Sequence, residues 1–441
     1  MIIGGQRQTG VRQEASINPS NTKETVGLAE QGDAASVRAA IRAVQDAQPD
    51  WAANTPQVRH DILLRAGQEI LARRDELGIL LAREEGKLLR EAVGEVTRAG
   101  HIFQFFAGEC LRNAGEILQS VRPGIGVEVT YEPVGLVGII APWNFPIAIP
   151  AWKIAPALAF GNAVVFKPAE LVPTMAWHLV DILHRAGLPS GVLNLVIGPG
   201  SIVGNAMLEA PELDAISFTG SQATGTRVAE ACARHRRKVQ LEMGGKNPLV
   251  VLDDADLDQA VECALDGAFY STGQRCTASS RLVVTEGIYS RFVETLSSRV
   301  RAMRVGDALD ERTDMGPVAS QAQLEQCLRF IEGARDQGGG LRTGGGLAHA
   351  SADGFFLEPT LFADTSMDMT INREEVFGPV ATVVRARDYD EALSIANDTE
   401  FGLCAGICTQ SLKFASDFRA KAQAGMVMVN LPTAGVDYHV P

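Results

Sequence analysis

The stretch AISFTGSQATGTRVAE, residues 215–230, has the pattern of a strand, a turn containing Gly220 and Gly225, and a helix. Two further strand-then-helix pairs precede it: NAVVFKP with PTMAWHLVDILHRAG (162–168, 173–187) and VLNLVIG with IVGNAMLEA (192–198, 202–210). Strands that alternate with segments of helical length form right-handed βαβ units, whose strands lie parallel. The sequence therefore predicts an α/β fold with a parallel sheet.

The rest of the chain divides around this region. Residues 33–120 are expected to be mostly helical, because apolar residues recur at spacings of three and four with charge on the other face. Strands with a turn at Glu132–Pro133 are expected near 124–140. Helical patterns return after a double glycine, so we place a domain boundary at Gly244–Gly245. The run GGGLRTGGG, 338–346, is expected to be a surface turn.

Composition excludes several classes of protein. The 441 residues are 46% hydrophobic and 21% charged, which suits a globular chain of two or more lobes. A net charge of −13 argues against partners such as nucleic acid or an anionic membrane surface, and the basic cluster at 233–239 is interpreted as a charged helix end. No apolar run is long enough to span a membrane, and the opening residues lack a secretory pattern.

The cysteines indicate a reducing compartment. Seven of them, an odd number, are scattered along the chain, and the one close pair, Cys404 and Cys408, has the spacing of neither a zinc site nor a redox dithiol. We therefore expect no metal and a cytoplasmic location.

Cys276 lies in FYSTGQRCTASSRLVV, residues 269–284, after the structure-breaking Gly273 and beside Arg275. A thiol on a loop near a cation has a lowered pKa and reacts as the thiolate, so Cys276 is a candidate nucleophile. The alternative is a buried cysteine that acts as a small hydrophobe.

Two other segments carry candidate catalytic groups. Glu242 ends an apolar strand before two glycines, and a carboxylate with apolar neighbours has a raised pKa and can act as a general base. A salt-bridged strand end is the alternative. Asn144 lies between Pro142 and Pro146, so its amide is preorganised to donate to a developing oxyanion.

Candidate cofactor groups follow two of the strands. The turn with Gly220 and Gly225 opens a helix, whose N-terminus attracts an anion, although a plain tight turn would look the same. Lys167 and Glu170 follow another strand at the edge where α/β sheets bind ligands, and they suit ribose hydroxyls. A solvated loop is the alternative there.

Six motifs together resemble the aldehyde dehydrogenase superfamily, and the resemblance runs from about residue 15 to the last residue. They are PWNFP (142–146), KPAE (167–170), FTGS (218–221), LEMGGKNP (241–248), GQRCTA (273–278) and EEVFGPV (374–380). Within the family, the segments 120–129 and 425–441 are most similar to α-ketoglutarate semialdehyde (2,5-dioxovalerate) dehydrogenases.

The resemblance implies an aldehyde-dehydrogenase-like fold. A Rossmann-type cofactor domain would comprise residues 1–114 and 134–244, and an α/β catalytic domain residues 245–441. Residues 115–133 would form a small β arm for oligomerisation, and the protein would be a homodimer or homotetramer. Relatives continue beyond the position of Pro441 with a Gly-rich loop and a final strand that reaches a partner subunit.

The resemblance also implies roles for individual residues. Cys276 would be the nucleophile, Glu242 the base, and Asn144 with the backbone N–H of Cys276 the oxyanion hole; Lys153 matches a lysine near a proton route behind the base. The cofactor would be NAD, because the Glu170 carboxylate repels a 2′-phosphate, with NADP possible. The residues expected to contact it are Trp143, Lys167, Glu170, Gly200, Gly220, Ser221, Gly225, Glu375 and Phe377.

The implied reaction is oxidation of a small aldehyde to a carboxylic acid through a thiohemiacetal and a thioester, with α-ketoglutarate semialdehyde as the expected substrate. Its remote carboxylate needs a cation, and Tyr270 stands where many succinate-semialdehyde relatives have an arginine. Arg275 and Arg281 are therefore the expected substrate-binding residues, and Arg275 is preferred. The alternatives are that Arg281 is a structural residue at the start of a strand and that Arg275, next to Cys276, points away from the aldehyde. Alternatives are a succinate or glutarate semialdehyde dehydrogenase, a broad-specificity enzyme, and a CoA-acylating or non-enzymatic relative.

Overall fold

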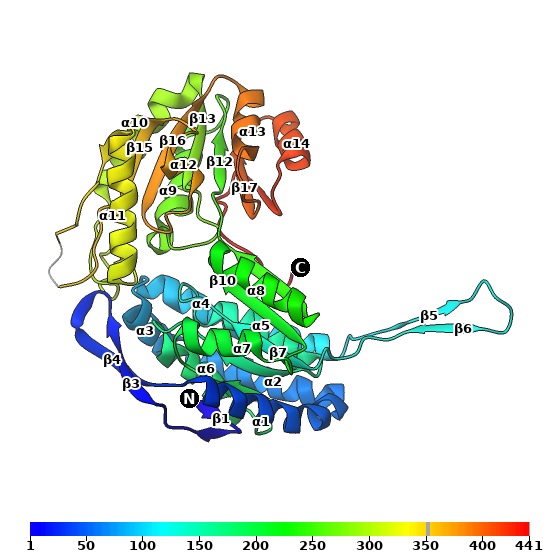
Figure 1. The fold of residues 1–441 in the computed structure, drawn as a ribbon. Coiled ribbons are helices and arrows are strands. Elements are labelled where there is room, and N and C mark those ends of the chain that lie inside the picture. Colours follow the sequence, from blue (N-terminus) through cyan, green and yellow to red (C-terminus); the bar gives the residue numbers. More distant parts are fainter. Residues whose placement is uncertain (350–352, 441) are drawn as a thin grey trace.

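The structure is a computed structural model that describes residues 1–349 and 353–440, so the end of the predicted second domain, Pro441, lies outside it. It contains two seven-stranded sheets, one below the other in Figure 1. In each sheet most neighbouring strands are parallel. The predicted α/β fold is confirmed.

The first sheet is built from the part of the chain before residue 244. Helices α1 (Ala34–Ala53), α5 (Ala148–Ala159), α6 (Pro173–Arg185) and α8 (Gln222–His235) pack against its strands. In spatial order the strands are β11 (Lys238–Met243), β10 (Ala215–Gly220), β7 (Leu136–Ile140), β8 (Ala163–Lys167), β9 (Leu193–Leu195), β1 (Ile2–Ile3) and β2 (Gln6–Arg7).

The second sheet follows. Its helices include α9 (Leu257–Phe269), α10 (Glu286–Ala302), α11 (Gln321–Asp336), α13 (Tyr389–Asn397) and α14 (Leu412–Lys421). The strand order is β14 (Gly340–Thr343), β15 (Thr360–Thr365), β16 (Val380–Ala386), β13 (Arg281–Thr285), β12 (Pro248–Val251), β17 (Cys404–Cys408) and β18 (Met426–Val429).

The chain passes from the first sheet to the second at Gly244 and Gly245. A Cβ on Gly244 would lie 2.0 Å from Oε2 of Glu375, so any larger residue would displace that carboxylate. Glycine lets the backbone pass directly against a carboxylate of the second unit.

Helices fill most of the segment 33–120, as predicted, with α2 (Pro56–Ala72), α3 (Arg74–Glu85) and α4 (Leu89–Cys110) following α1. The charges at the α3–α4 corner do not face solvent, however, so that part of the expectation is wrong. Five charged side chains are buried there, Glu84, Glu85, Lys87, Glu91 and Glu95.

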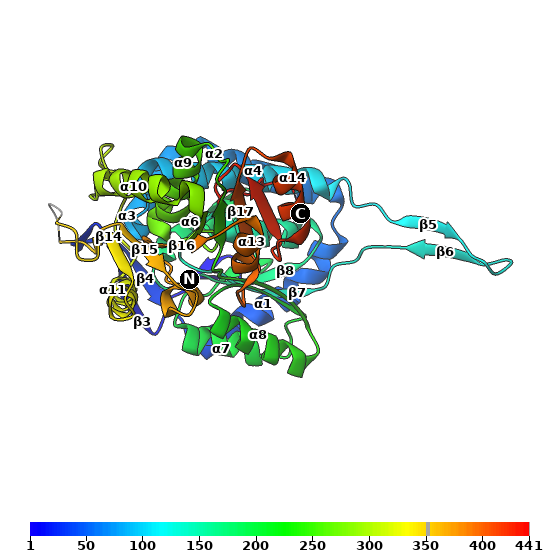
Figure 2. The same ribbon diagram turned by 90° about the horizontal axis from the view of Figure 1, so that it is seen from above.

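A hairpin projects from the body of the protein (Figures 1 and 2). It consists of β5 (Glu116–Gln119) and β6 (Gly126–Val129). The Ile117 side chain is 85% exposed and Val121 is fully exposed. An apolar ribbon held in water is typical of a segment that another chain covers.

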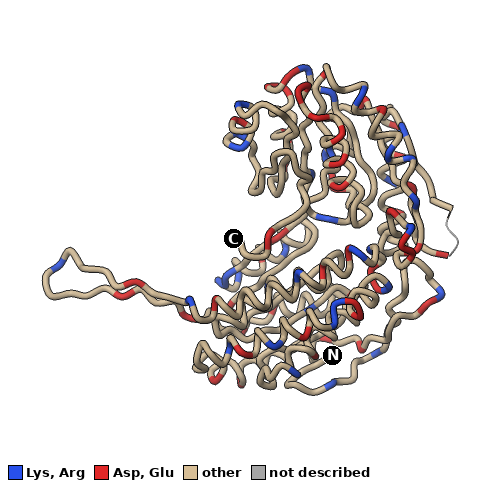
Figure 3. Tube along the Cα trace, turned by 180° about the vertical axis from the view of Figure 1, so that it is seen from behind, with Lys and Arg blue, Asp and Glu red and all other residues tan. Residues whose placement is uncertain are grey.

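Charge is spread over the whole surface. Lys and Arg alternate with Asp and Glu along the trace in Figure 3, and no long basic stretch stands out. Among the described residues, no helix combines the length and the apolar character that crossing a membrane requires.

The glycine-rich run 338–346 is more ordered than predicted. Gly340–Thr343 forms β14, an edge strand antiparallel to β15, and the turns are confined to its two ends, where Gly338, Gly344 and Gly345 have positive φ. The prediction of a surface turn for the whole run is therefore wrong. The middle of the run forms a short strand at the edge of the second sheet, and edge strands in natural sheets are often short.

Arg281, at the start of β13, is fully buried. Its guanidinium donates to the carbonyl oxygens of Ile395 (3.0 Å), Ala396 (2.9 Å) and Asp398 (3.2 Å) at the end of α13. The structure gives Arg281 this structural role instead of the predicted contact with substrate, because its donors are committed to a helix C-terminus.

We expect Arg281→Gln to lower the melting temperature by about 5 °C or more, because buried helix-end carbonyls lose their charged donor. Differential scanning calorimetry measures the shift. Arg291→Gln removes the same charge from an exposed position on α10 and is the control, expected to leave the melting temperature within about 1 °C. Equal melting temperatures for both variants would contradict this role.

Candidate active site

A cleft of about 200 Å³ lies where the two sheets meet, and both units line it. The loop after β7 contributes to it, as do the end of β10, the Cys276 loop and the segment around Glu375. It brings together seven of the predicted site residues, Trp143, Asn144, Gly220, Ser221, Cys276, Glu375 and Phe377.

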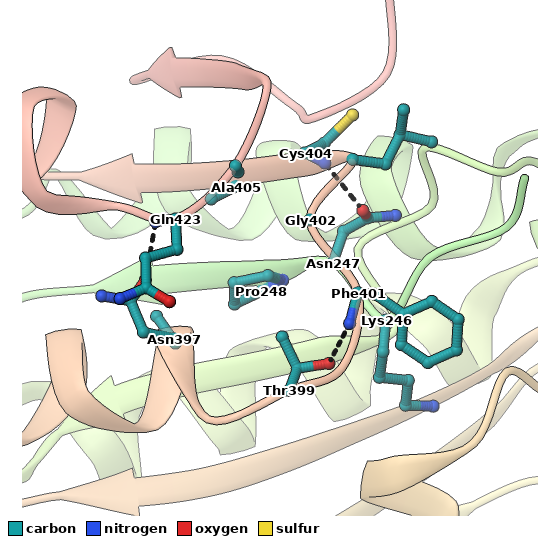
Figure 4. A pocket seen from close by; sticks show the side chains of 13 residues that line it. Lys246, Asn247, Pro248, Asn397, Thr399, Phe401, Gly402, Cys404, Ala405 and Gln423 are labelled. Atoms are coloured by element: carbon teal, nitrogen blue, oxygen red, sulfur yellow. Dashed lines mark hydrogen bonds between the residues drawn. The ribbon is translucent and has the colours of Figure 1, made fainter. Parts of the chain in front are cut away.

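Cys276 is held by a strained loop and a buried amide. Ser271 and Thr272, just before it, have left-handed φ values of 50° and 57°, a conformation that survives only where the surroundings impose it. The amide of Asn247 donates to the carbonyl oxygens of Cys276 (2.7 Å) and Ala278 (3.0 Å). Its oxygen accepts from the N–H of Cys404 (3.0 Å), as Figure 4 shows beside a small cavity. Asn247 therefore fixes the position of the thiol, a role that sequence reasoning missed.

The pKa of Cys276 is raised to about 11, by burial first and then by Glu375 and Glu242. The expected lowering by Arg275 is therefore wrong. The Arg275 guanidinium donates to the carbonyl oxygens of Asp266 and Gly267 and lies over the Tyr270 ring, so it adds little positive potential at the sulfur.

Arg275 is also absent from the lining of the cleft. Its side chain is buried and its donors face backbone carbonyls, so the structure does not support the predicted contact with an aldehyde.

Asn144 lies just before α5 and is buried, with its amide donating to the carbonyl of Gln274 (2.9 Å). Its own carbonyl accepts from the ammonium of Lys87 (2.6 Å), which also pairs with Glu95 (2.6 Å). Glu95 in turn accepts from the backbone N–H groups of Ile147 (3.0 Å) and Ala148 (3.1 Å), where α5 begins. A buried ion pair thus fixes the predicted oxyanion donor.

Glu91 fixes the backbone before Cys276, as Glu95 fixes the backbone at the start of α5. Its carboxylate accepts from the N–H of Ser271 (3.0 Å) in the loop that leads to Cys276. Glu91 and Glu95 share one face of α4, and Lys87 lies in the loop just before that helix, four residues ahead of Glu91. This spacing could have identified them, although such a charged stripe usually faces water.

Glu242 is exposed on the edge strand β11 and does not line the cleft. The apolar surroundings expected for it are wrong. Its carboxylate accepts from the Gln240 amide (2.9 Å), whose oxygen accepts from the Lys153 ammonium (2.9 Å). Burial lowers the pKa of Lys153 to about 8, while Glu242 opposes this shift. These three side chains form a polar chain from the protein interior to Glu242, the predicted base.

The predicted ribose-binding groups adjoin the carboxyl end of β8. Lys167 is buried, its ammonium donates to the carbonyl of Pro168 (2.8 Å), and burial lowers its pKa to about 8. Glu170 is exposed and accepts from the N–H of Gly200 (2.9 Å). Gly225 is inside α8, where a Cβ would lie 2.4 Å from the sulfur of Met243, so it serves close packing instead of the predicted cofactor contact.

The opposite side of the cleft presents Glu375 and Phe377. Glu375 accepts from the N–H of Gly245 (3.0 Å), and burial raises its pKa. Phe377 has a left-handed φ of 58° and meets Trp143 edge to face at 5.4 Å. Gln323 donates to the carbonyl of Phe377 (2.9 Å), which holds this conformation and was not predicted.

These groups suit a dinucleotide. Carboxylates at Glu170 and Glu375 can accept from ribose hydroxyls. The backbone at Gly200 is open, since a Cβ there would meet no atom within 4 Å, and this leaves room for a phosphate. Among residues 1–349 and 353–440, no group of three or more His, Cys, Asp or Glu could hold a metal ion.

Comparison with known proteins agrees with this geometry. The model of the aldehyde dehydrogenase family matches residues 6–441. An α-ketoglutaric semialdehyde dehydrogenase of Bacillus subtilis is 41% identical over 96% of this chain and 87% of its own length. A betaine aldehyde dehydrogenase of Cereibacter sphaeroides is 43% identical over 94% and 85%.

Solved structures have the same fold. A betaine aldehyde dehydrogenase of Staphylococcus aureus, crystallised with NAD⁺, is 33% identical with a TM-score of 0.95, covering 98% of this chain and 86% of that one. An NADP-dependent enzyme of E. coli is 35% identical with a TM-score of 0.95, covering 98% and 90%. The chain therefore belongs to the aldehyde dehydrogenase family and is an NAD(P)-dependent aldehyde dehydrogenase.

Proposed function

We propose that this enzyme oxidises α-ketoglutarate semialdehyde (2,5-dioxopentanoate) to 2-oxoglutarate. The observation that carries the chemistry is the meeting of Cys276 and Asn144 in one cleft with Glu375 on its other side. The substrate rests on relatives named for it, among them enzymes of Haloferax volcanii, 42% identical, and Saccharolobus solfataricus, 39% identical.

In the proposed reaction, the thiolate of Cys276 adds to the aldehyde carbon, and the carbonyl electron pair moves to the oxygen. The second N–H of the Asn144 amide and the backbone N–H of Cys276 stabilise that oxyanion. Lys167, Glu170 and Glu375 would hold oxidised NAD(P), which would supply the hydride acceptor and a positive ring that favours the thiolate. Loss of hydride leaves a thioester on Cys276.

Hydrolysis of the thioester requires Glu242 to leave Gln240 and turn toward the cleft, where it takes a proton from the attacking water. Cys276 departs as the thiolate and the carboxylic acid is released. Glu242, which is exposed, then releases the proton to water and returns to Gln240, and Lys153 is the next ionisable group along that polar chain. The exposure of Glu242 leaves its side chain free to rotate.

We propose NAD as the preferred cofactor, because the Glu170 carboxylate would repel a 2′-phosphate. We also propose the division into a cofactor domain (1–114, 134–244), an arm (115–133) and a catalytic domain (245–441). Assembly as a homodimer or homotetramer is supported by the exposed apolar hairpin. A cytoplasmic location completes the proposal, supported by seven cysteines that are all unbridged.

The substrate is tested with a panel of 2,5-dioxopentanoate, succinate semialdehyde, glutaraldehyde, betaine aldehyde and an uncharged aliphatic aldehyde. We expect the keto acid semialdehyde to have the highest kcat/KM, by about tenfold or more over the uncharged aldehyde, because its carboxylate adds a charge-assisted contact. Equal efficiency on charged and uncharged aldehydes would discard this substrate and leave the dehydrogenase activity standing.

Glu242→Gln should separate the two halves of the reaction. Hydride transfer does not need the base, so we expect a burst of about one NADH per site followed by slow turnover. Rapid-mixing absorbance measures the burst, and Cys276→Ala, expected to give neither burst nor turnover, is the control. Normal steady-state turnover of Glu242→Gln would mean that another group activates the water.

The raised pKa of Cys276 predicts the pH dependence of its alkylation in the cofactor-free enzyme. With a pKa of about 11, the thiolate fraction and hence the rate with iodoacetamide should rise about tenfold per pH unit from pH 7 to 10. Mass spectrometry follows the reaction, and Cys276→Ser should abolish it because the other six cysteines are buried. A plateau between pH 7 and 8 would contradict the raised pKa.

A further inference from the structure

Helix α5 leads from the cleft toward a cation on α4. Ile149 lines the cleft, and Trp152, half-buried, lies one turn further along the same face of α5. The guanidinium of Arg98 lies over the Trp152 ring, 5.8 Å from its centroid. One turn earlier on α4, Glu95 accepts from the N–H of Ala148, so the two helices are in contact at this level.

The same face of α4 borders the segment that follows the second sheet. His101 and Phe105 lie one and two turns beyond Arg98, and their rings meet that of Tyr438 at 5.3 and 6.4 Å. The segment leading to Tyr438 begins at Thr433, whose hydroxyl donates to the carbonyl of Thr277, next to Cys276 (2.6 Å). Arg98 therefore lies where α4, α5 and residues 433–438 come together. We infer that the space between these three elements is a passage that leads to Cys276.

Arg98 is half-buried, and it makes no hydrogen bond or ion pair with any residue in the described part of the chain. Arg275 and Arg281, by contrast, are committed to backbone carbonyls. A guanidinium held on an aromatic ring keeps its planar fork of donors available, and that fork matches a carboxylate. The guanidinium N–H groups of Arg98 are thus available to bind a carboxylate in the passage.

We propose that Arg98 binds the remote carboxylate of the substrate and selects acidic aldehydes over uncharged and cationic ones. The inference rests on the proposed function and names the residue responsible for its specificity. In 2,5-dioxopentanoate the carboxylate is four carbon–carbon bonds of about 1.5 Å from the aldehyde carbon, so an extended substrate would point its charge away from Cys276 along the passage. A quaternary ammonium aldehyde would meet a like charge there, which disfavours its binding.

The test compares Arg98→Met, Arg98→Lys and wild type on 2,5-dioxopentanoate, succinate semialdehyde, betaine aldehyde and pentanal. For Arg98→Met we expect kcat/KM on the two acids to fall about 30- to 100-fold, mainly through KM, with pentanal changed less than about threefold. Arg98→Lys should retain part of the acid preference, because it keeps the charge and loses the fork. Arg38→Met, an exposed arginine of α1, is the control and should match wild type.

Inhibition by the product gives a second readout. The inhibition constant of 2-oxoglutarate against pentanal should rise in Arg98→Met by a factor similar to the loss on acids. If Arg98→Met fails to turn over pentanal, Arg98→Gln, which keeps a polar side chain, takes its place in both measurements.

The outcomes separate this inference from the proposed function. Loss of acid preference together with weaker inhibition by 2-oxoglutarate supports Arg98. A wild-type preference for acids that survives in Arg98→Met overturns the role of Arg98 and leaves the substrate standing. A wild-type preference for betaine aldehyde or pentanal overturns both.

Discussion

The site depends on one buried ion pair, Lys87 with Glu95. Removing two charges from water is costly. The cost is offset here because the ammonium and the carboxylate also make hydrogen bonds to the backbone. The ammonium holds the carbonyl of Asn144, and the carboxylate holds the first N–H groups of α5. Burial alone would lower the pKa of Lys87, but the nearby carboxylates together have the larger effect. The pKa is raised overall, so the ammonium stays charged. The position of Asn144 therefore depends on an ion pair between the loop that precedes α4 and α4 itself.

Helix α4 also fixes the loop on the other side of the cleft, since Glu91 accepts from the N–H of Ser271, five residues before the proposed nucleophile Cys276. Asn247 holds the Cys276 carbonyl from the second sheet. The proposed reacting groups, Cys276 and Asn144, are thus positioned by side chains that do not line the cleft. Preorganisation of this kind is what a developing oxyanion requires, because donors that must first reorient stabilise it less. The strain at Ser271 and Thr272 persists because anchors on both sides impose it.

The sequence predicted the α/β fold and brought seven site residues to one cleft, because strand–helix alternation and glycine-flanked motifs are local signals. It failed where an outcome depends on distant groups. Arg275 is adjacent to Cys276 in the chain, yet its guanidinium turns to the carbonyls of Asp266 and Gly267. The buried charges around Lys87 looked like a solvated helix face for the same reason, since only tertiary packing determines which face is covered. The exposure of Glu242 could not be read from its apolar strand, because β11 is at the edge of its sheet.

Sequence identity does not separate the candidate substrates, because relatives named for an acidic semialdehyde and for betaine aldehyde are 41% and 43% identical to this chain. The two aldehydes carry opposite charges remote from the same reacting group, so discrimination must arise where that charge lies and not at Cys276. The surroundings of Cys276 are already acidic, because Glu375 in the cleft and Glu242 outside it both raise the pKa of the thiol. An anionic substrate would be repelled there unless a cation lies further along its path. An unpaired guanidinium on the α4 side, set against Trp152 within the described part of the chain, supplies that counter-charge at a distance from the sulfur. The sign of a single side chain can thus decide specificity where similarity along the whole chain does not.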